Sequence, residues 1–181
     1  MVVIGTAFTY DDLCQMPDDG KRYEILEGEL AVSPSPKTKH QRVVKRMVAF
    51  LSRAQDAGFG EAFVAPLDVV FDAHNVTEPD AFFISTERSA IVTEDNIQGA
   101  PDLVVEVLSG STRGRDVGAK LRIYARHRVA HYWVVDPDAQ TVQPYEWQEN
   151  GYREKGLLRV GDLLTCPLFP TVSTDVAALF G

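Results

Sequence analysis

The stretch Pro101-Asp102-Leu103-Val104-Val105-Glu106-Val107-Leu108-Ser109 decides the fold of this chain. Its aliphatic and β-branched residues predict a strand in the interior of a sheet. Because side chains alternate along a strand, Glu106 shares a face with Val104 and Leu108. An ionised carboxylate between aliphatic side chains is costly to bury without a partner. We therefore expect Glu106 to meet a cation, a basic side chain or a wet cleft; the alternative is a structural ion pair with an arginine.

The residues around this strand predict an α/β fold with a mixed central sheet. Periodicity and turn signals predict helices at about 37–57 and 115–127, and strands at about 22–26, 29–32, 61–71, 76–85, 131–135, 141–147 and 152–158. The central order is helix, strand, strand, strand, helix, strand. One hairpin turns around Glu27-Gly28 and a second around Asn150-Gly151. Residues 86–100 are expected to form a loop with some helix, and the tail a turn and a short helix.

Composition bounds the class of protein. The chain has 181 residues with 45% hydrophobic and 24% charged residues, which is typical of one soluble domain, here residues 1–181. No run approaches the roughly 20 apolar residues of a membrane-spanning helix, so no membrane partner is expected. Cys14 and Cys166 lie far apart and form no CxxC pair, which argues against a zinc site or a disulfide framework. These features indicate a cytoplasmic protein.

The basic residues are concentrated in two segments of an otherwise acidic chain. The net charge is -8, yet residues 36–53 hold six of the 18 basic residues and no acid, and residues 109–131 hold six against Asp116 alone. Such segments favour a local anion-binding face, and the alternative is two solvated helix faces. The candidates for phosphate contacts are His40, Lys45, Arg113 and Arg115. A lone histidine such as His40 is otherwise an ordinary surface residue.

Three residues supply the parts of a hydrolytic metal site. Asp80 opens one strand, Glu106 lies in the next, and Lys120 lies on the helix that follows. Two carboxylates on neighbouring strands suit Mg²⁺, with Mn²⁺ as a substitute. A bound divalent ion makes water easier to deprotonate, and a nearby ammonium stabilises charge on a phosphate. The set predicts phosphodiester hydrolysis, with Asp80 and Glu106 as metal ligands and Lys120 as the third catalytic residue.

Asp102 competes with Asp80 for the ligand role. It shares the face of Glu106 but lies four residues away, which is about 13 Å along one strand at ~3.3 Å per residue. That separation is too large for two ligands of one ion in an unbent strand. We therefore favour Asp80, on a neighbouring strand, and expect Asp102 to be a supporting residue that holds an arginine.

Two further acids are candidate supporting residues. Glu27, near the first helix, is a candidate to complete the metal shell, although the alternative of a hairpin surface residue is favoured. Asp116 lies one helical turn from Lys120. Asp116 and Lys120 are expected to flank a buried stripe of the helix that contains Val117, Leu121 and Tyr124.

These motifs together resemble the Uma-type restriction endonucleases of the PD-(D/E)xK nuclease superfamily. The resemblance covers about residues 9–180 and is carried by Tyr23–Leu30, Ser33–Pro36, Pro79-Asp80, Pro101–Ser109, Ser111–Arg113, Asp116, Lys120-Leu121, Tyr124 and Tyr132–Pro137. It implies a restriction-endonuclease-like core with added N-terminal and C-terminal β-hairpins, and Mg²⁺-dependent DNA cleavage. One position departs from the superfamily pattern. The lysine two residues after the acid is replaced by Leu108, and Lys120 is the candidate to replace it, as in related nucleases.

The sequence therefore predicts a metal-dependent endonuclease that hydrolyses DNA phosphodiester bonds. Nucleases of this kind cut two strands as pairs, so we expect a homodimer. A competing hypothesis is a catalytically inactive module that binds nucleic acid or assembles with partners while keeping the nuclease fold. Leu108 and the acidic net charge motivate it. A third is a dimer without any nucleic-acid role. Salt-dependent DNA binding without metal-dependent cleavage would distinguish the second hypothesis from the first.

Overall fold

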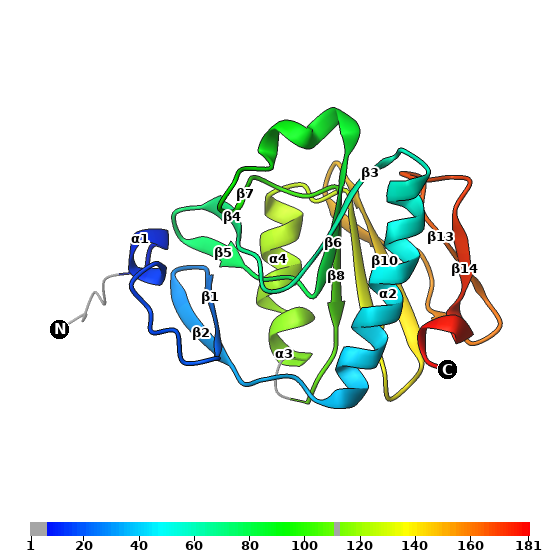
Figure 1. Ribbon diagram of the computed structural model, residues 1–181, viewed down its shortest axis with the longest axis horizontal. Helices are drawn as coiled ribbons and strands as arrows, with labels where there is room; N and C mark the ends of the chain where they lie inside the picture. Colours follow the sequence, from blue (N-terminus) through cyan, green and yellow to red (C-terminus); the bar gives the residue numbers. More distant parts are fainter. Residues whose placement is uncertain (1–6, 111–112) are drawn as a thin grey trace.

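The computed structural model describes residues 7–110 and 113–181 and shows a mixed α/β fold. Its largest sheet has seven strands, and the six on its main path run in the order β11-β10-β9-β8-β6-β3. Their bounds are β3 Gly60–Val64, β6 Ala81–Ser85, β8 Leu103–Val107, β9 His131–Asp136, β10 Thr141–Gln148 and β11 Gly151–Glu154. The seventh strand, β12 Leu158–Arg159, also pairs with β10. Strand β8, the predicted central strand, lies in the interior between β6 and β9 (Figure 1).

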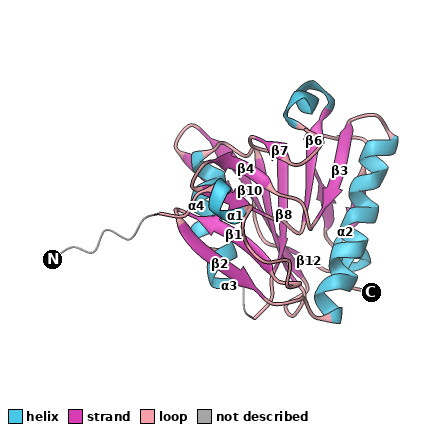
Figure 2. Cartoon of the chain, turned by 60° about the vertical axis from the view of Figure 1, so that its left-hand side comes forward, coloured by secondary structure: helices cyan, strands magenta, loops and turns pink. Residues whose placement is uncertain are grey.

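Each face of β8 packs against a different layer. Leu103, Val105 and Val107 join a core with the buried side of helix α2 (Thr38–Asp56). Val104 and Leu108 join a second core that includes residues of helix α4 (Ala119–Arg126). The two helices therefore lie on opposite sides of the large sheet, as Figures 1 and 2 show. The predicted alternation of the central strand is confirmed, and it places Glu106 on the α4 side.

The N-terminal hairpin belongs to a second sheet. Five strands form it in the order β2-β1-β5-β4-β7. Their bounds are β1 Arg22–Leu26, β2 Glu29–Ser33, β4 Val69–Asp72, β5 Asn75–Thr77 and β7 Ile97–Gln98. The prediction that one strand runs through residues 61–71 is wrong, because the chain leaves the large sheet after Val64 and pairs β4 with β5 and β7 instead. Helix α1 (Tyr10–Leu13) packs near β1.

The predicted helix at 115–127 is two helices. Helix α3 (Arg113–Asp116) ends before Gly118, and α4 begins at Ala119. A Cβ on Gly118 would lie 2.5 Å from the carbonyl oxygen of Gly114, so the close approach of these backbones requires glycine. The break turns Val117 outward, with 46% of its surface exposed, which contradicts the predicted buried stripe. Asp116 and Lys120, expected to flank the stripe, are themselves buried.

The C-terminal region closes the α2 side of the large sheet. The predicted hairpin around Asn150-Gly151 is present as β10 paired with β11. Strands β13 (Leu163–Thr165) and β14 (Ser173–Asp175) form a further hairpin, followed by the short helix η2 (Val176–Leu179) that packs on α2.

Helix η1 (Thr86–Ile91) is the helix expected within the loop after β6. No helix among the described residues is long and apolar enough to cross a membrane.

Candidate active site

Asp80, which immediately precedes β6, lies beside Glu106 of the adjacent strand β8. Strands β6 and β8 are antiparallel, and Ala81 pairs with Val105, so the next position in this register brings Asp80 beside Glu106. The backbone N–H of Val107 donates to Asp80 Oδ2 at 2.8 Å, which fixes the carboxylate at this point. Both carboxylates are buried, with 3% of Asp80 and 1% of Glu106 exposed. The juxtaposition expected from the sequence is therefore present, and the role of the pair as metal ligands remains a prediction.

Asp80 is surrounded by donors. Its Oδ2 lies 3.1 Å from His40 Nε2, from the first turn of α2, and its Oδ1 accepts from Arg22 NH1 at 3.1 Å. Burial favours the neutral carboxyl, but the hydrogen bonds and charges of His40 and Arg22 outweigh it and hold the pKa of Asp80 below its ordinary value. Asp80 is therefore an ionised carboxylate at neutral pH.

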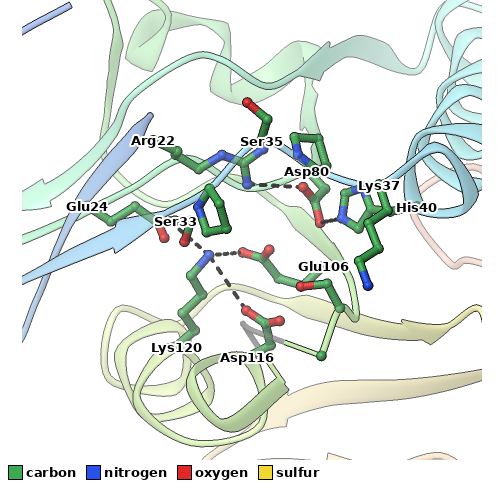
Figure 3. Close-up of a pocket in the computed structure, with 14 residues that line it drawn as sticks. Arg22, Glu24, Ser33, Ser35, Lys37, His40, Asp80, Glu106, Asp116 and Lys120 are labelled. Carbon is green, nitrogen blue, oxygen red and sulfur yellow. Dashed lines mark hydrogen bonds and ion pairs between the residues drawn. The ribbon is translucent and has the colours of Figure 1, made fainter. Parts of the chain in front are cut away.

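Lys120 reaches the pocket from α4 and binds several carboxylates. Its Nζ lies 2.9 Å from Glu106 Oε1, 2.8 Å from Glu24 Oε1 and 3.8 Å from Asp116 Oδ1 (Figure 3). Burial alone would lower the pKa of the amine, but the charges of Glu106, Glu24 and Asp116 raise it well above its usual value. Lys120 is therefore a permanent ammonium at neutral pH, suited to stabilise negative charge rather than to accept a proton.

Glu24 is a site residue that the sequence reasoning missed. It lies on β1, in the second sheet, and only 2% of its surface is exposed. Besides pairing with Lys120, its Oε1 accepts the backbone N–H of Glu78 at 2.9 Å, so it joins β1 to the segment just before β6. The sequence pattern that could have identified Glu24 is its place in a predicted strand between Tyr23 and Ile25. A carboxylate buried in a strand needs a partner, as was argued for Glu106.

A single pocket connects these groups. Its volume is about 310 Å³, and the second sheet, the start of α2, the end of β8 and the α3–α4 region supply its walls. The 14 lining residues are Arg22, Glu24, Ser33, Pro34, Ser35, Pro36, Lys37, His40, Asp80, Glu106, Ser109, Gly110, Asp116 and Lys120. In Figure 3 the Arg22 side chain points toward Asp80 and the Lys120 side chain points toward Glu106, and a dashed line marks each contact.

The pocket suits a divalent cation by its donors. Glu24, Asp80, Glu106 and Asp116 offer the hard carboxylate oxygens that Mg²⁺ prefers. Burial is the main reason why the pKa of Glu106 is raised to about 8, and the charges of the neighbouring acids add to it. Lys120 opposes this shift but does not cancel it. The cations of the pocket therefore do not fully compensate its acidic groups. In the arrangement described, no three His, Cys, Asp or Glu side chains converge as a ready-made metal-ligand group among residues 7–110 and 113–181. An ion would therefore have to share Asp80 and Glu106 with their present cationic partners.

Tyr124 completes the surroundings of Glu106. Its hydroxyl donates to Glu106 Oε1 at 2.7 Å, so this oxygen accepts from both Lys120 and Tyr124. Leu108, which stands where the superfamily has lysine, is 7% exposed and packs in the core on the α4 side. The prediction that a lysine from the following helix reaches Glu106 instead is consistent with this geometry.

Two of the predicted supporting acids lie outside the pocket. Asp102 accepts the backbone N–H of Ser85 at 2.8 Å and pairs with Arg88 at 3.3 Å, at the opposite end of β8 from the pocket. It holds an arginine, as expected, but does not support Glu106 directly. Glu27 lies at the surface, where it pairs with Arg122 at 2.6 Å and with Arg126 at 3.1 Å. The expectation that Glu27 completes a metal shell is not met, because the β1–β2 turn points it toward the outside of α4. Asp116 does line the pocket.

Some of the predicted phosphate-binding residues lie at the pocket and others lie away from it. His40 lies in the pocket but is 7% exposed and faces Asp80, so it orients a carboxylate and is not a surface residue. Lys45 is exposed on the outer face of α2, away from the pocket lining. Arg113 pairs with Asp136. Arg115 donates to Ser33 Oγ at 2.9 Å and to the carbonyl oxygen of Val32 at 3.1 Å, which ties α3 to β2 at the pocket wall.

Comparisons with known proteins show the family and the fold of this chain. A family model named Uma2, with the description "Putative restriction endonuclease", matches residues 9–177. A crystal structure of a putative nuclease belonging to DUF820 from Anabaena variabilis ATCC 29413 is similar, with a TM-score of 0.80. The two chains are 23% identical, and the match covers 96% of this chain and 97% of the other, which establishes a shared fold. No curated protein matches the sequence.

Proposed function

Because this chain belongs to the Uma2 family of putative restriction endonucleases, we propose that it is a metal-dependent endonuclease that hydrolyses DNA phosphodiester bonds at the pocket around Glu106. One observation carries the proposal. Asp80, just before β6, lies beside Glu106 of the antiparallel strand β8, and Lys120 contacts Glu106 from helix α4, all within one pocket. This is the arrangement of two carboxylates and one ammonium that metal-assisted hydrolysis of a phosphate needs.

The side chains have separate roles in this proposal. Asp80 and Glu106 would hold Mg²⁺ or Mn²⁺, with Glu24 as a further carboxylate that lines the same pocket. A bound ion of this kind supplies a Lewis acid that lowers the pKa of water and offsets charge on the phosphate. Lys120 remains charged and stabilises negative charge that develops on the phosphate oxygens. His40 and the Val107 N–H keep Asp80 in place while this happens.

The basic outer face of α2 is the candidate surface for the DNA backbone. Arg42, Lys45 and Arg53 are exposed there at helical spacing, and none of them makes an ion pair within the described part of the chain. The second basic segment differs, because Arg113, Arg122 and Arg126 are paired with acids. In a chain of net charge -8, the unpaired side chains on α2 form the stronger attraction for phosphates.

Cleavage assays with purified protein test the proposal. Wild type is expected to cleave duplex or single-stranded DNA only when Mg²⁺ or Mn²⁺ is present. Asp80→Ala and Glu106→Ala should each lose this activity, while Asp102→Ala, which alters a carboxylate at the far end of β8, should retain most of it. Equal activity of wild type and the Glu106→Ala variant would mean that a contaminant, or another site, cuts the DNA.

The alternative of a non-catalytic nucleic-acid-binding module has one observation in its favour. Both oxygens of Asp80 already accept hydrogen bonds, and Lys120 is held between Glu24 and Glu106. If these contacts are permanent, the protein should bind DNA in a salt-dependent way without cutting it in Mg²⁺ or Mn²⁺. The same assays, combined with a DNA-binding titration, therefore separate the two functions.

A further inference from the structure

Arg22 is a second cation of the pocket, and it is held differently from Lys120. Its NH1 lies 3.1 Å from Asp80 Oδ1 and donates to the carbonyl oxygen of Glu78 at 3.2 Å, and its Nε lies 3.4 Å from Glu78 Oε2. Its side chain is 20% exposed, compared with 3% for Lys120. Both residues line the pocket, and the Arg22 side chain is partly exposed there whereas the Lys120 side chain is enclosed.

The position of Arg22 conflicts with the ligand role of Asp80. Under the proposed function Asp80 offers oxygens to a divalent cation, yet Oδ1 is already bound to the guanidinium. Two cations that use one buried carboxylate oxygen compete, because each removes charge that the other needs. Asp80 can keep its His40 and Val107 hydrogen bonds through Oδ2 while Oδ1 changes partner. Only the contact with Arg22 has to break.

We propose that Arg22 neutralises Asp80 in the metal-free protein, yields Asp80 Oδ1 to a divalent cation, and then binds the phosphodiester of the substrate. This inference rests on the proposed function, whose ion and substrate it uses. The Glu78 contacts anchor the guanidinium at the pocket wall, so that it stays within the pocket after it leaves Asp80. A planar guanidinium with several donors is well matched to the oxygens of a phosphate.

The first test is metal binding without DNA. Mn²⁺ titrations followed by electron paramagnetic resonance should show that Arg22→Ala binds Mn²⁺ about tenfold more tightly than wild type, because a competing cation is gone. Arg88→Ala is the matched control: it removes the Arg88–Asp102 pair at the other end of β8, 3.3 Å in length, and should leave Mn²⁺ affinity unchanged. Unchanged or weaker Mn²⁺ binding by Arg22→Ala would overturn the inference.

The second test is DNA binding in Ca²⁺, a divalent cation that also takes oxygen ligands. Arg22→Ala should bind a duplex oligonucleotide more weakly, and the slope of log K against log salt should be smaller by about 0.9, the value of one phosphate contact. Equal slopes for the two proteins would contradict the phosphate-binding role. Thermal melting verifies that each variant is folded. If Arg22→Ala does not fold, Arg22→Lys replaces it, with a smaller gain in Mn²⁺ affinity and a retained salt slope as the expected results.

The outcomes separate this inference from the proposed function. Tighter Mn²⁺ binding by Arg22→Ala, together with a wild type that never cuts DNA, would refute the endonuclease and retain the competition at Asp80. Metal-dependent cleavage by wild type, together with equal Mn²⁺ affinities, would retain the endonuclease and refute the inference.

Discussion

The Lys120 ammonium lies 2.9 Å from Glu106 Oε1, and only 3% and 2% of these two side chains are exposed. The contact joins the crossover helix α4 to the central strand β8 at the floor of the pocket. Glu24 meets the same ammonium from the second sheet, so one nitrogen connects three elements of the fold. Structure and proposed chemistry therefore depend on the same ion pairs.

Loss of the Lys120 charge should destabilise the protein strongly. Lys120→Met would leave Glu24 and Glu106 close together without their cation, and removing one partner of a buried pair costs about 3–5 kcal/mol. Lys39→Met is the control, since it breaks an exposed pair with Asp138 and should cost less than about 1 kcal/mol. Urea denaturation measures both. A similar, small loss for the two variants would show that Lys120 is not a structural counter-ion.

The stability of the metal-free protein should depend on pH through Glu106. Burial raises the pKa of this carboxyl to about 8, whereas in the unfolded chain it is close to 4.5. The folded state therefore holds the proton more tightly, and the associated stability is complete below pH 4.5 and is lost as the pH rises through 8. Glu106→Gln cannot titrate at this position. With EDTA present, the melting temperature of wild type should fall relative to this variant between pH 5 and pH 8.5, and a constant difference would contradict the assignment.

Gly118 should be sensitive to a single methyl group. In Gly118→Ala the new Cβ would meet the Gly114 carbonyl oxygen at 2.5 Å, so the junction of α3 and α4 must shift. A loss of about 1–3 kcal/mol in the free energy of unfolding is expected. Gly114→Ala is the matched control, because its added Cβ meets nothing within 4 Å, and it should be neutral or slightly stabilising. Equal effects of the two substitutions on thermal unfolding would refute the steric explanation.

The unpaired basic face of α2 should contribute to DNA affinity. Replacing Arg42 and Lys45 together by alanine should weaken duplex binding and lower the salt slope by about 1.8, for two phosphate contacts. The control pair Arg122→Ala and Arg126→Ala removes two residues that Glu27 already neutralises, and should change the slope less. Filter-binding titrations at several salt concentrations give these slopes. A larger effect of the control pair would place the DNA on the other basic segment.

The sequence predicted the elements that local patterns determine. Alternation along 101–109 correctly placed Glu106 on the same face as Val104 and Leu108, and Asn150-Gly151 marked a hairpin that is present. The break at Gly118 was missed because it depends on the approach of a carbonyl four residues earlier, which a helical periodicity does not contain. For this reason Val117 was predicted to be buried, whereas it is exposed in the structure.

The positions of site residues that could not be predicted from the sequence depend on pairing between strands that are distant in the chain. The adjacency of Asp80 and Glu106 followed from strand order, so it could be predicted. The entry of Glu24 into the pocket depends on β1 joining β5 in a separate sheet, where Ile25 pairs with Val76, 51 residues later, and no local pattern encodes such a contact. The same sheet turns Glu27 outward toward Arg122 and away from the site for which it was considered.

A metal-dependent active site at Asp80 and Glu106 is tested most directly by DNA cleavage in the presence and absence of Mn²⁺, with wild type and with Glu106→Gln, a variant of nearly the same shape. We expect cleavage by wild type that EDTA abolishes, and a loss of at least about a hundredfold in the variant. Cleavage that survives EDTA, or that Glu106→Gln retains, would contradict a metal-dependent active site at Asp80 and Glu106.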